Sequence, residues 1–303
     1  MLKRTLILVH RWLGVALCLI FLLWFPSGIA MMYWDFPSVT EADRLRRSPA
    51  LVPSTIHLSP AEAYARLGDD QPPGQARLTT FDRRPVYLFS GGGGEAMVYA
   101  DSGERQVEVS DAMLARIASA WTGQPAGAAT IEPVGRVDQW TIQGEFQNFS
   151  PLRKYSWPDG EQLYLSENTG AVVQYTTTAS RLGAYVGAIP HWLYFLPLRQ
   201  HGLEWSRLVV WSSGLGTVSA LAGLVIAVWM YSPSRRYRYA GAPTGIPYRG
   251  QKRWHTILGL LFGAGAVTWA FSGMLSMDPF PIRGGPAWIS RSAGLQACLS
   301  RSG

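Results

Sequence analysis

Cysteine is almost absent from this chain. Cys18 and Cys298 are the only two cysteines among 303 residues, and the long segment between them has none. That segment must therefore fold without disulfide bonds. The sequence Cys-x-x-Cys-His does not occur either, so covalent attachment of haem is not expected.

The chain also lacks the common signatures of soluble enzymes. It contains no Gly-x-Ser-x-Gly, no His-Glu-x-x-His and no flavin or nicotinamide fingerprint. Residues 91–94 are consecutive glycines, but no Gly-Lys-Ser/Thr follows them and no helix is predicted to begin there. A phosphate-binding loop is therefore disfavoured.

Acidic residues are missing from residues 232–253, which carry six basic residues between two apolar runs. The apolar runs are 5–34, 208–231 and 254–277. Each run is close to or above the ~20 residues that cross the ~30 Å hydrocarbon core of a bilayer. We therefore predict transmembrane helices within residues 1–36, 204–232 and 254–278, with a basic loop at 233–253.

Basic residues also set the expected orientation. Lys3, Arg4 and Arg11 flank the first run, and positive residues favour the cytoplasmic side. The N-terminus is then cytoplasmic and residues 37–200 lie outside. The first run exceeds the ~7–15 apolar residues of a signal peptide, so we expect an uncleaved helix. The net charge of +7 then reflects topology beside membrane lipid, and no nucleic-acid partner is expected.

Residues 37–181 are predicted to form an α+β region of two small units. Ser59 and Glu62 suit a capping box, and residues 110–121 suit a short amphipathic helix. A tyrosine-bearing strand followed by a polar turn ending in glycine occurs twice, at 98–103 and 163–170. Strands are expected at 84–89, 96–100, 137–142, 153–157, 162–166 and 171–175, and a linker at 44–53.

Residues 182–203 are apolar and aromatic, but Pro190 and Pro197 interrupt them. We expect an interfacial amphipathic segment, with a helix over 182–196 lying on the outer leaflet. The predicted fold class is thus a membrane α-helical bundle of three spans with an inserted α+β domain.

A histidine-centred pattern occurs twice in the apolar runs. Each copy has a histidine, then Leu at +3, Gly at +4, Trp at +14 and Ser-Gly at +17 and +18. On a helix, the histidine, both glycines and the tryptophan share one face. The copies are His10, Leu13, Gly14, Trp24, Ser27 and Gly28, and His255, Leu258, Gly259, Trp269, Ser272 and Gly273.

This pattern suits ligation of one haem by two histidines on different membrane helices. A porphyrin beside a helix needs a residue without a side chain about one turn from its ligand, as Gly14 and Gly259 supply. An ionisable residue within a span is costly and is therefore a functional candidate. The competing interpretation is that small residues merely pack the helices. The pairing favours His10 and His255 as ligands of haem iron.

Two further histidines, His191 and His201, lie near the expected outer face. Together with the inner pair they predict two haem levels, one per leaflet, and a path for electrons across the bilayer. A neutral imidazole nitrogen is a good iron ligand, and the other ring nitrogen usually donates to a fixed acceptor. His57 lies outside any such pattern and is expected on the surface.

These segments resemble the PepSY-associated transmembrane proteins, which include iron-regulated bacterial inner-membrane proteins and ferric-siderophore reductases. The resemblance covers residues 1–280 approximately and implies b-type haem, a periplasmic PepSY-like region within 37–200, and electron delivery to a ferric chelate. Family members usually continue to a fourth helix, whereas residues 279–303 form a tail. A truncation, a frame change and a separate short subgroup are all left open. The matching segments are His10-Arg11-Trp12-Leu13-Gly14, Ser27-Gly28, Leu58-Ser59-Pro60-Ala61-Glu62-Ala63 and Trp254-His255 to Ser272-Gly273-Met274.

The leading hypothesis is an inner-membrane oxidoreductase with one or two haem b groups that reduces ferric siderophore in the periplasm. Its electron donor would be a quinol or another reductase. The alternative is a non-redox PepSY membrane protein that binds a partner or regulates a peptidase in the periplasm. A transporter of iron chelates ranks last, because three spans give a poor path unless the chain forms a homo-oligomer.

Overall fold

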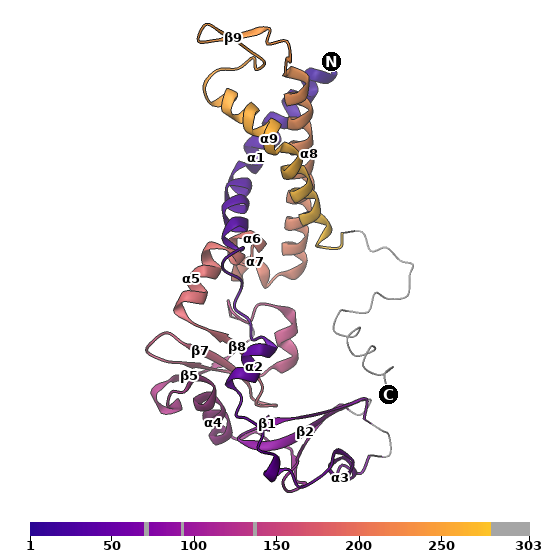
Figure 1. Ribbon diagram of the computed structural model, residues 1–303, viewed down its shortest axis with the longest axis vertical. Helices are drawn as coiled ribbons and strands as arrows, with labels where there is room; N and C mark the ends of the chain where they lie inside the picture. The colour runs from indigo at the N-terminus through magenta and orange to yellow at the C-terminus, as the bar shows by residue number, and fades with distance from the viewer. Residues whose placement is uncertain (70–72, 92–93, 136–137, 280–303) are drawn as a thin grey trace. The chain divides into compact units, whose positions relative to one another are not determined.

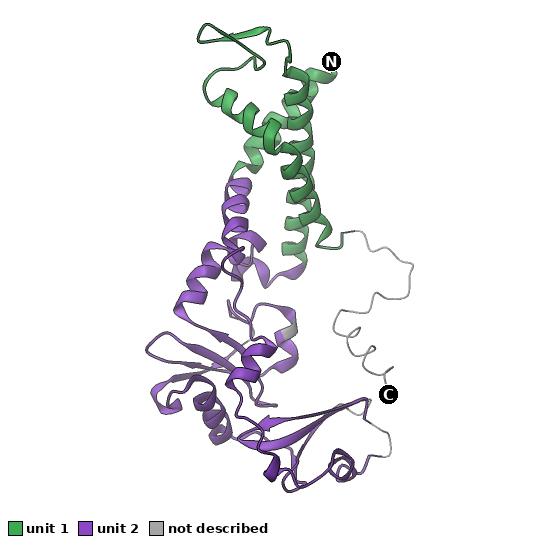
Figure 2. Cartoon of the chain, viewed as in Figure 1, with its two compact units in different colours: residues 1–18, 203–303 green, residues 19–202 purple. Residues whose placement is uncertain are grey.

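The structure is a computed structural model that describes residues 1–69, 73–91, 94–135 and 138–279. The chain divides into two compact units (Figure 2). One unit comprises residues 1–18 and 203–303, and the other comprises residues 19–202. Because the division falls inside the first helix, that helix contributes to both units.

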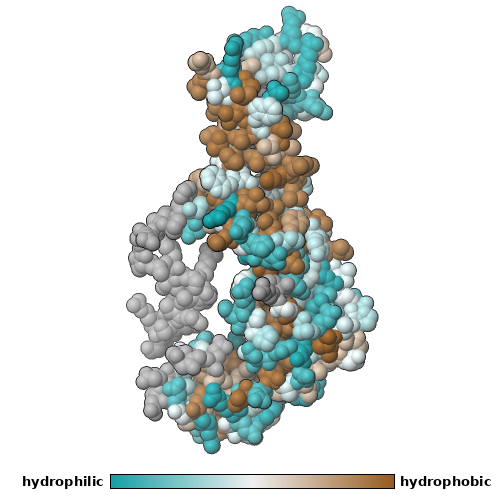
Figure 3. Space-filling view, turned by 180° about the vertical axis from the view of Figure 1, so that it is seen from behind, coloured by the Kyte–Doolittle hydropathy of each residue, from teal (hydrophilic) through white to brown (hydrophobic). Residues whose placement is uncertain are grey.

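Three long apolar helices are present: α1 (Leu2–Ala30), α8 (Gly202–Met230) and α9 (Gly250–Leu275) (Figure 1). Each is long and apolar enough to cross a membrane, as the sequence predicts. The basic loop between α8 and α9 contains a short antiparallel hairpin of β9 (Tyr237–Tyr239) and β10 (Ala242–Thr244). Apolar side chains cover the visible face of the long helices, and hydrophilic ones gather around this hairpin (Figure 3).

Small residues allow α8 and α9 to approach closely. A Cβ atom added at Gly214 would lie 3.3 Å from the Met274 sulfur, and one added at Gly263 would lie 3.1 Å from Leu224 Cδ1. The Ser212 hydroxyl donates to the Leu208 carbonyl one turn earlier. Such small-residue packing holds membrane helices together where no hydrophobic driving force exists between them.

The first sheet is an antiparallel meander of β1 (Gln75–Phe81), β2 (Arg84–Gly91), β3 (Gly94–Tyr99) and β4 (Arg105–Gln106). Asp82 and Arg83 have φ values of 46° and 66°, which suit the tight β1–β2 turn. The helix α3 (Pro60–Ala65) packs Ala63 into a buried cluster with this sheet. The Ser59 hydroxyl accepts from the Glu62 backbone N–H and the Glu62 carboxylate accepts from Ser59, which confirms the predicted capping box.

The second sheet is an antiparallel meander of β5 (Thr130–Val134), β6 (Leu152–Ser156), β7 (Gln162–Ser166) and β8 (Val172–Thr176). The helix α4 (Asp111–Thr122) packs Leu114 and Ala118 against Tyr155 and Leu163, and all four side chains are fully buried or nearly so. Short 3-10 turns, η2 (Ala126–Ala128) and η3 (Gly144–Phe149), connect these elements. Among the described residues of 19–202, the largest buried apolar cluster lies between this sheet and α4.

Both sheets close the turn after their third strand in the same way. In each, the N–H that follows the strand bonds to a proline carbonyl, and a glycine N–H bonds back to the strand's end. Gly103 and Gly170 complete these turns with φ values of 76° and 66°, where a side chain would be strained. The paired bonds are Ala100 to Pro85 and Gly103 to Tyr99, and Glu167 to Pro151 and Gly170 to Ser166.

The predicted strand over 137–142 is wrong where the structure describes it. Residues 138–142 form a turn, because the Asp138 carboxylate accepts from the backbone N–H groups of Trp140 and Thr141. The outer strand of this sheet is β5, which the sequence reasoning missed. β5 contains Pro133, and a proline is tolerated there because β5 lies at the sheet edge.

Two other local predictions are corrected. The expected linker begins within a helix, since α2 (Glu41–Arg47) is started by a capping box of Thr40 and Asp43, and η1 (Pro53–Thr55) follows it. The expected single helix over 182–196 is broken at Gly187 and Leu193. It is replaced by α5 (Thr178–Val186), α6 (Ala188–Trp192) and α7 (Leu196–Arg199).

At Gly187 the backbone leaves the helical conformation, with φ of −102° and ψ of −92°. A Cβ atom there would lie 3.1 Å from the Trp34 carbonyl oxygen, so α5 and α6 meet where the chain leaves α1. Leu193 adopts a left-handed conformation with φ of 52°, which ends α6. The segment therefore lies beside the C-terminal end of α1 as short pieces.

Candidate functional site

The two histidines of the repeated pattern lie next to each other. His10 on α1 and His255 on α9 have ring centroids 5.9 Å apart, with their planes tilted by 33°. They are 245 positions apart in sequence, so the adjacency comes from the packing of helices. The His10 ring is half-buried, and the His255 ring is exposed on the helix surface.

Helix α8 fixes the orientation of His10. The Nδ1 atom of His10 lies 2.9 Å from the backbone carbonyl oxygen of Ser219 on α8. A carbonyl oxygen only accepts, so Nδ1 must carry the proton in this hydrogen bond. In the neutral ring, Nε2 then holds a lone pair. This is the arrangement that metal-ligating histidines use, with the second nitrogen donating to a fixed acceptor.

The two glycines of the pattern face open space. A Cβ atom added to Gly14 or to Gly259 would meet no atom within 4 Å. Each glycine lies one helical turn from its histidine. The structure thus leaves room beside both histidines, although helix surfaces that face lipid are also open.

Two imidazole side chains at this separation could together hold one haem iron. Two imidazoles bonded to one metal from opposite sides, each at about 2 Å, have ring centroids roughly 6 Å apart. The observed separation of 5.9 Å agrees with that value. Among the described residues, no group of three or more His, Cys, Asp or Glu side chains could hold a bare metal ion. Haem needs only two ligands from the protein, because the porphyrin supplies the others.

The other two histidines occupy different surroundings. His191 on α6 is half-buried, and its Nδ1 atom lies 3.2 Å from the Trp24 carbonyl oxygen and 3.4 Å from the Ser27 hydroxyl. Burial lowers the pKa of His191, and the hydrogen bond to Trp24 partly opposes this shift. His201 is exposed just before α8. The two histidines belong to different elements, since His191 lies on α6 and His201 lies between α7 and α8.

Sequence reasoning missed two residues of this site, Ser219 and Gly223 on α8. A Cβ atom added to Gly223 would lie only 2.5 Å from Cε1 of His10. The available signal was the row of small residues along α8, which the sequence presents as ordinary helix packing. The row is Ser212, Gly216, Ser219, Gly223 and Ala227.

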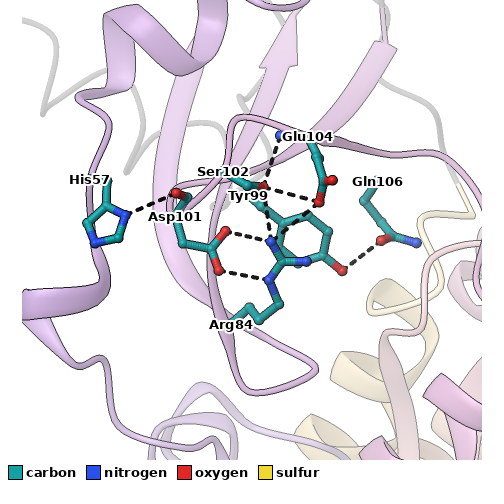
Figure 4. A network of polar contacts seen from close by, with 7 residues as sticks. All are labelled: His57, Arg84, Tyr99, Asp101, Ser102, Glu104 and Gln106. Atoms are coloured by element: carbon teal, nitrogen blue, oxygen red, sulfur yellow. Dashed lines mark hydrogen bonds and ion pairs between the residues drawn. The ribbon is translucent and has the colours of Figure 1, made fainter.

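A second polar cluster lies on the first sheet (Figure 4). The Arg84 guanidinium donates to both carboxylate oxygens of Asp101, at 2.8 and 2.7 Å, and stacks over the Tyr99 ring at 3.7 Å. This bidentate contact holds the pKa of Asp101 below its usual range. His57 is exposed, as predicted, with Nδ1 3.1 Å from the Asp101 carbonyl oxygen. The cluster ties the start of β2 to the turn after β3 and so has a structural role.

The fold and these helices define an integral membrane protein that combines three candidate spanning helices with an α+β region. The chain belongs to the family described as the PepSY-associated TM region, whose model matches residues 7–288. That match includes both histidine patterns and both sheets. No curated protein and no solved structure matches the chain.

Proposed function

We propose that this membrane protein binds haem b between His10 and His255 and carries electrons through it to a ferric siderophore on the outer side of the bacterial inner membrane. The observation that carries the proposal is the pairing of the two rings at 5.9 Å on separate helices. The N-terminus would be cytoplasmic and residues 37–200 periplasmic, as the distribution of basic residues favours.

The chain's own residues would hold and shape the site. His10 and His255 would hold the haem iron through an imidazole nitrogen each, and the bond from His10 Nδ1–H to the Ser219 carbonyl would leave Nε2 as the ligating atom of His10. Gly14 and Gly259 leave the space beside these histidines open. When bound, haem supplies a one-electron iron couple whose potential depends on its axial ligands and their hydrogen bonds.

The outward path remains part of the proposal. His191 and His201 would form a second, outer haem level, and His191 is already oriented by the Trp24 carbonyl. Fe(III) in the chelate would take up one electron, which weakens chelation and frees Fe(II). The donor would be a quinol or another reductase, because the sequence has no flavin or nicotinamide fingerprint.

Anaerobic reoxidation tests this function directly. The purified protein is reduced with a stoichiometric amount of dithionite in mild detergent, and ferrichrome is added with a chelator that traps Fe(II). We expect the haem to reoxidise with one Fe(II) trapped per electron lost. The gallium complex of the same siderophore is the control, because Ga(III) cannot accept the electron.

Two outcomes would count against the proposal. Haem that reoxidises equally with the iron and gallium complexes would remove the siderophore as acceptor. Colourless protein purified from haem-sufficient cells would favour the non-redox alternative, in which the PepSY-like region binds a partner or regulates a peptidase.

A further inference from the structure

We infer that Ser219 and Gly223 of α8 form a positioning site for His10, and that Gly223 is required because only glycine admits the imidazole there. This inference rests on the proposed haem site, but it concerns a helix that supplies no ligand. It assigns α8 a role beyond closing the helix bundle.

Two observations converge on the same helical turn. His10 Nδ1 lies 2.9 Å from the Ser219 carbonyl oxygen. A Cβ atom at Gly223 would lie 2.5 Å from His10 Cε1, 2.9 Å from Nδ1 and 3.1 Å from Nε2. Gly223 follows Ser219 by four positions, so its own N–H is the helical partner of that same carbonyl. The ring thus meets α8 at a carbonyl that lies beside a glycine.

Alanine at position 223 could not be accommodated without moving the ring. Two ring atoms would lie within 3.0 Å of the new Cβ atom, which is closer than real Cβ contacts come. The imidazole is short and rigid, so it could not bend away as a long flexible side chain could. The shift would break the Nδ1–H bond to Ser219 or turn the ring away from His255. Either change would disturb the pair while leaving both histidines in place.

The hydrogen bond has a chemical effect as well as a steric one. Donation from Nδ1–H to a fixed acceptor sets the tautomer and raises the basicity of the ligating nitrogen. A more basic axial ligand favours ferric over ferrous iron, so it lowers the reduction potential. Ser219 acts through its backbone carbonyl, which no side-chain substitution removes, and Gly223 is therefore the position to change.

The experiment compares Gly223→Ala with Gly265→Ala in the full-length protein. Gly265 is a matched control, because it lies on membrane helix α9 and a Cβ atom there would meet nothing within 4 Å. The measurements are the haem-to-protein ratio, the midpoint potential and the low-spin electron paramagnetic resonance spectrum. We expect Gly223→Ala to weaken haem binding by about 10–100-fold, the usual effect of losing a residue that orients a ligand. Any haem retained should show a raised potential, and Gly265→Ala should match the wild type.

A double-mutant cycle separates positioning from general misfolding. If the damage arises from a clash with the His10 ring, Gly223→Ala as a single substitution should lower the apparent Tm of haem-free protein. The same substitution made in a His10→Ala background should not lower it. In that background the added alanine should be neutral or stabilising, since alanine favours a helix over glycine. Equal loss of Tm in both backgrounds would overturn the inference.

The outcomes also separate this inference from the proposed function. Wild-type protein without haem would end the proposed function. Wild-type protein with haem, together with a Gly223→Ala variant of unchanged haem content, potential and spectrum, would end only the role assigned to α8.

Discussion

Gln174 offers the sharpest test of how the second sheet is tied to the segment that follows α1. Its side chain, on β8, is fully buried. Its amide nitrogen donates to the Pro37 carbonyl oxygen at 2.7 Å and to the Trp140 carbonyl oxygen at 3.0 Å. Pro37 lies just after α1 and Trp140 lies in the 138–142 turn, so one amide links the exit of α1 to the second sheet.

Replacing Gln174 by methionine keeps the side-chain length but removes both donors. Two buried carbonyl oxygens would lose their partners, and each such loss costs about 1–3 kcal/mol. Since both carbonyls bond to the same amide group, the two losses are not independent, and we expect a total of about 2–4 kcal/mol rather than the full sum. For a unit of this size, each kcal/mol lowers Tm by about 2–4 °C, so the expected shift is on the order of 4–16 °C.

The assay is tryptophan fluorescence during heating of the full chain in mild detergent, followed at a fixed scan rate. Gln200→Met is the control, because Gln200 is exposed and its amide lies at 3.4 Å from its carbonyl partner. The control should change Tm by less than about 2 °C, as surface substitutions usually do. If Gln174→Met and Gln200→Met have the same Tm, the two hydrogen bonds of Gln174 contribute little to stability and the prediction is wrong.

Two further predictions concern the sheets. The Arg84 hydrogen bonds depress the pKa of folded Asp101, so their stabilisation is present above its unfolded pKa of about 4 and is lost as pH falls through the folded value. Wild-type Tm should therefore drop below about pH 4, and Asp101→Asn should drop less; an equal drop would refute this cause. Gly170→Ala should destabilise by about 1–3 kcal/mol, because φ is 66° and a Cβ atom would lie 2.7 Å from Phe81 Cε2. Unchanged urea unfolding of that variant would contradict the assignment.

Patterns that are local in the sequence predicted local structure well. Hydropathy alone located the three long helices, since a spanning helix must satisfy its backbone internally and be apolar throughout. Ser59 and Glu62 located the start of α3, because capping involves groups only three residues apart. The glycine turns ending the third strands were also visible, since positive φ favours glycine.

Features that depend on distant contacts were missed. β5 contains a proline, and only its position at the sheet edge makes that proline tolerable. The turn at 138–142 is an exception, because its contacts are local. Its composition is strand-like, but the Asp138 carboxylate accepts from the N–H groups of Trp140 and Thr141. The helix over 182–196 is broken where Gly187 meets the backbone of Trp34, 153 positions earlier.

The candidate site shows the same division. The repeated pattern pointed to His10 and His255 as candidate site residues, because it occurs twice in the sequence. It could not identify Gly223, because the need for glycine there arises from a ring on another helix. The tail at 280–303 lies outside the described residues, so the expectations about it stay as predictions.

Haem binding by His10 and His255 is tested by the dithionite-reduced minus oxidised visible spectrum of purified protein, with its haem-to-protein ratio. It is recorded for the wild type, His10→Ala, His255→Ala and the surface control His57→Ala. We expect a b-type spectrum in the wild type and in the control, with loss of the His10–His255 haem in both of the other variants. An unchanged spectrum and ratio in both His10→Ala and His255→Ala would contradict it.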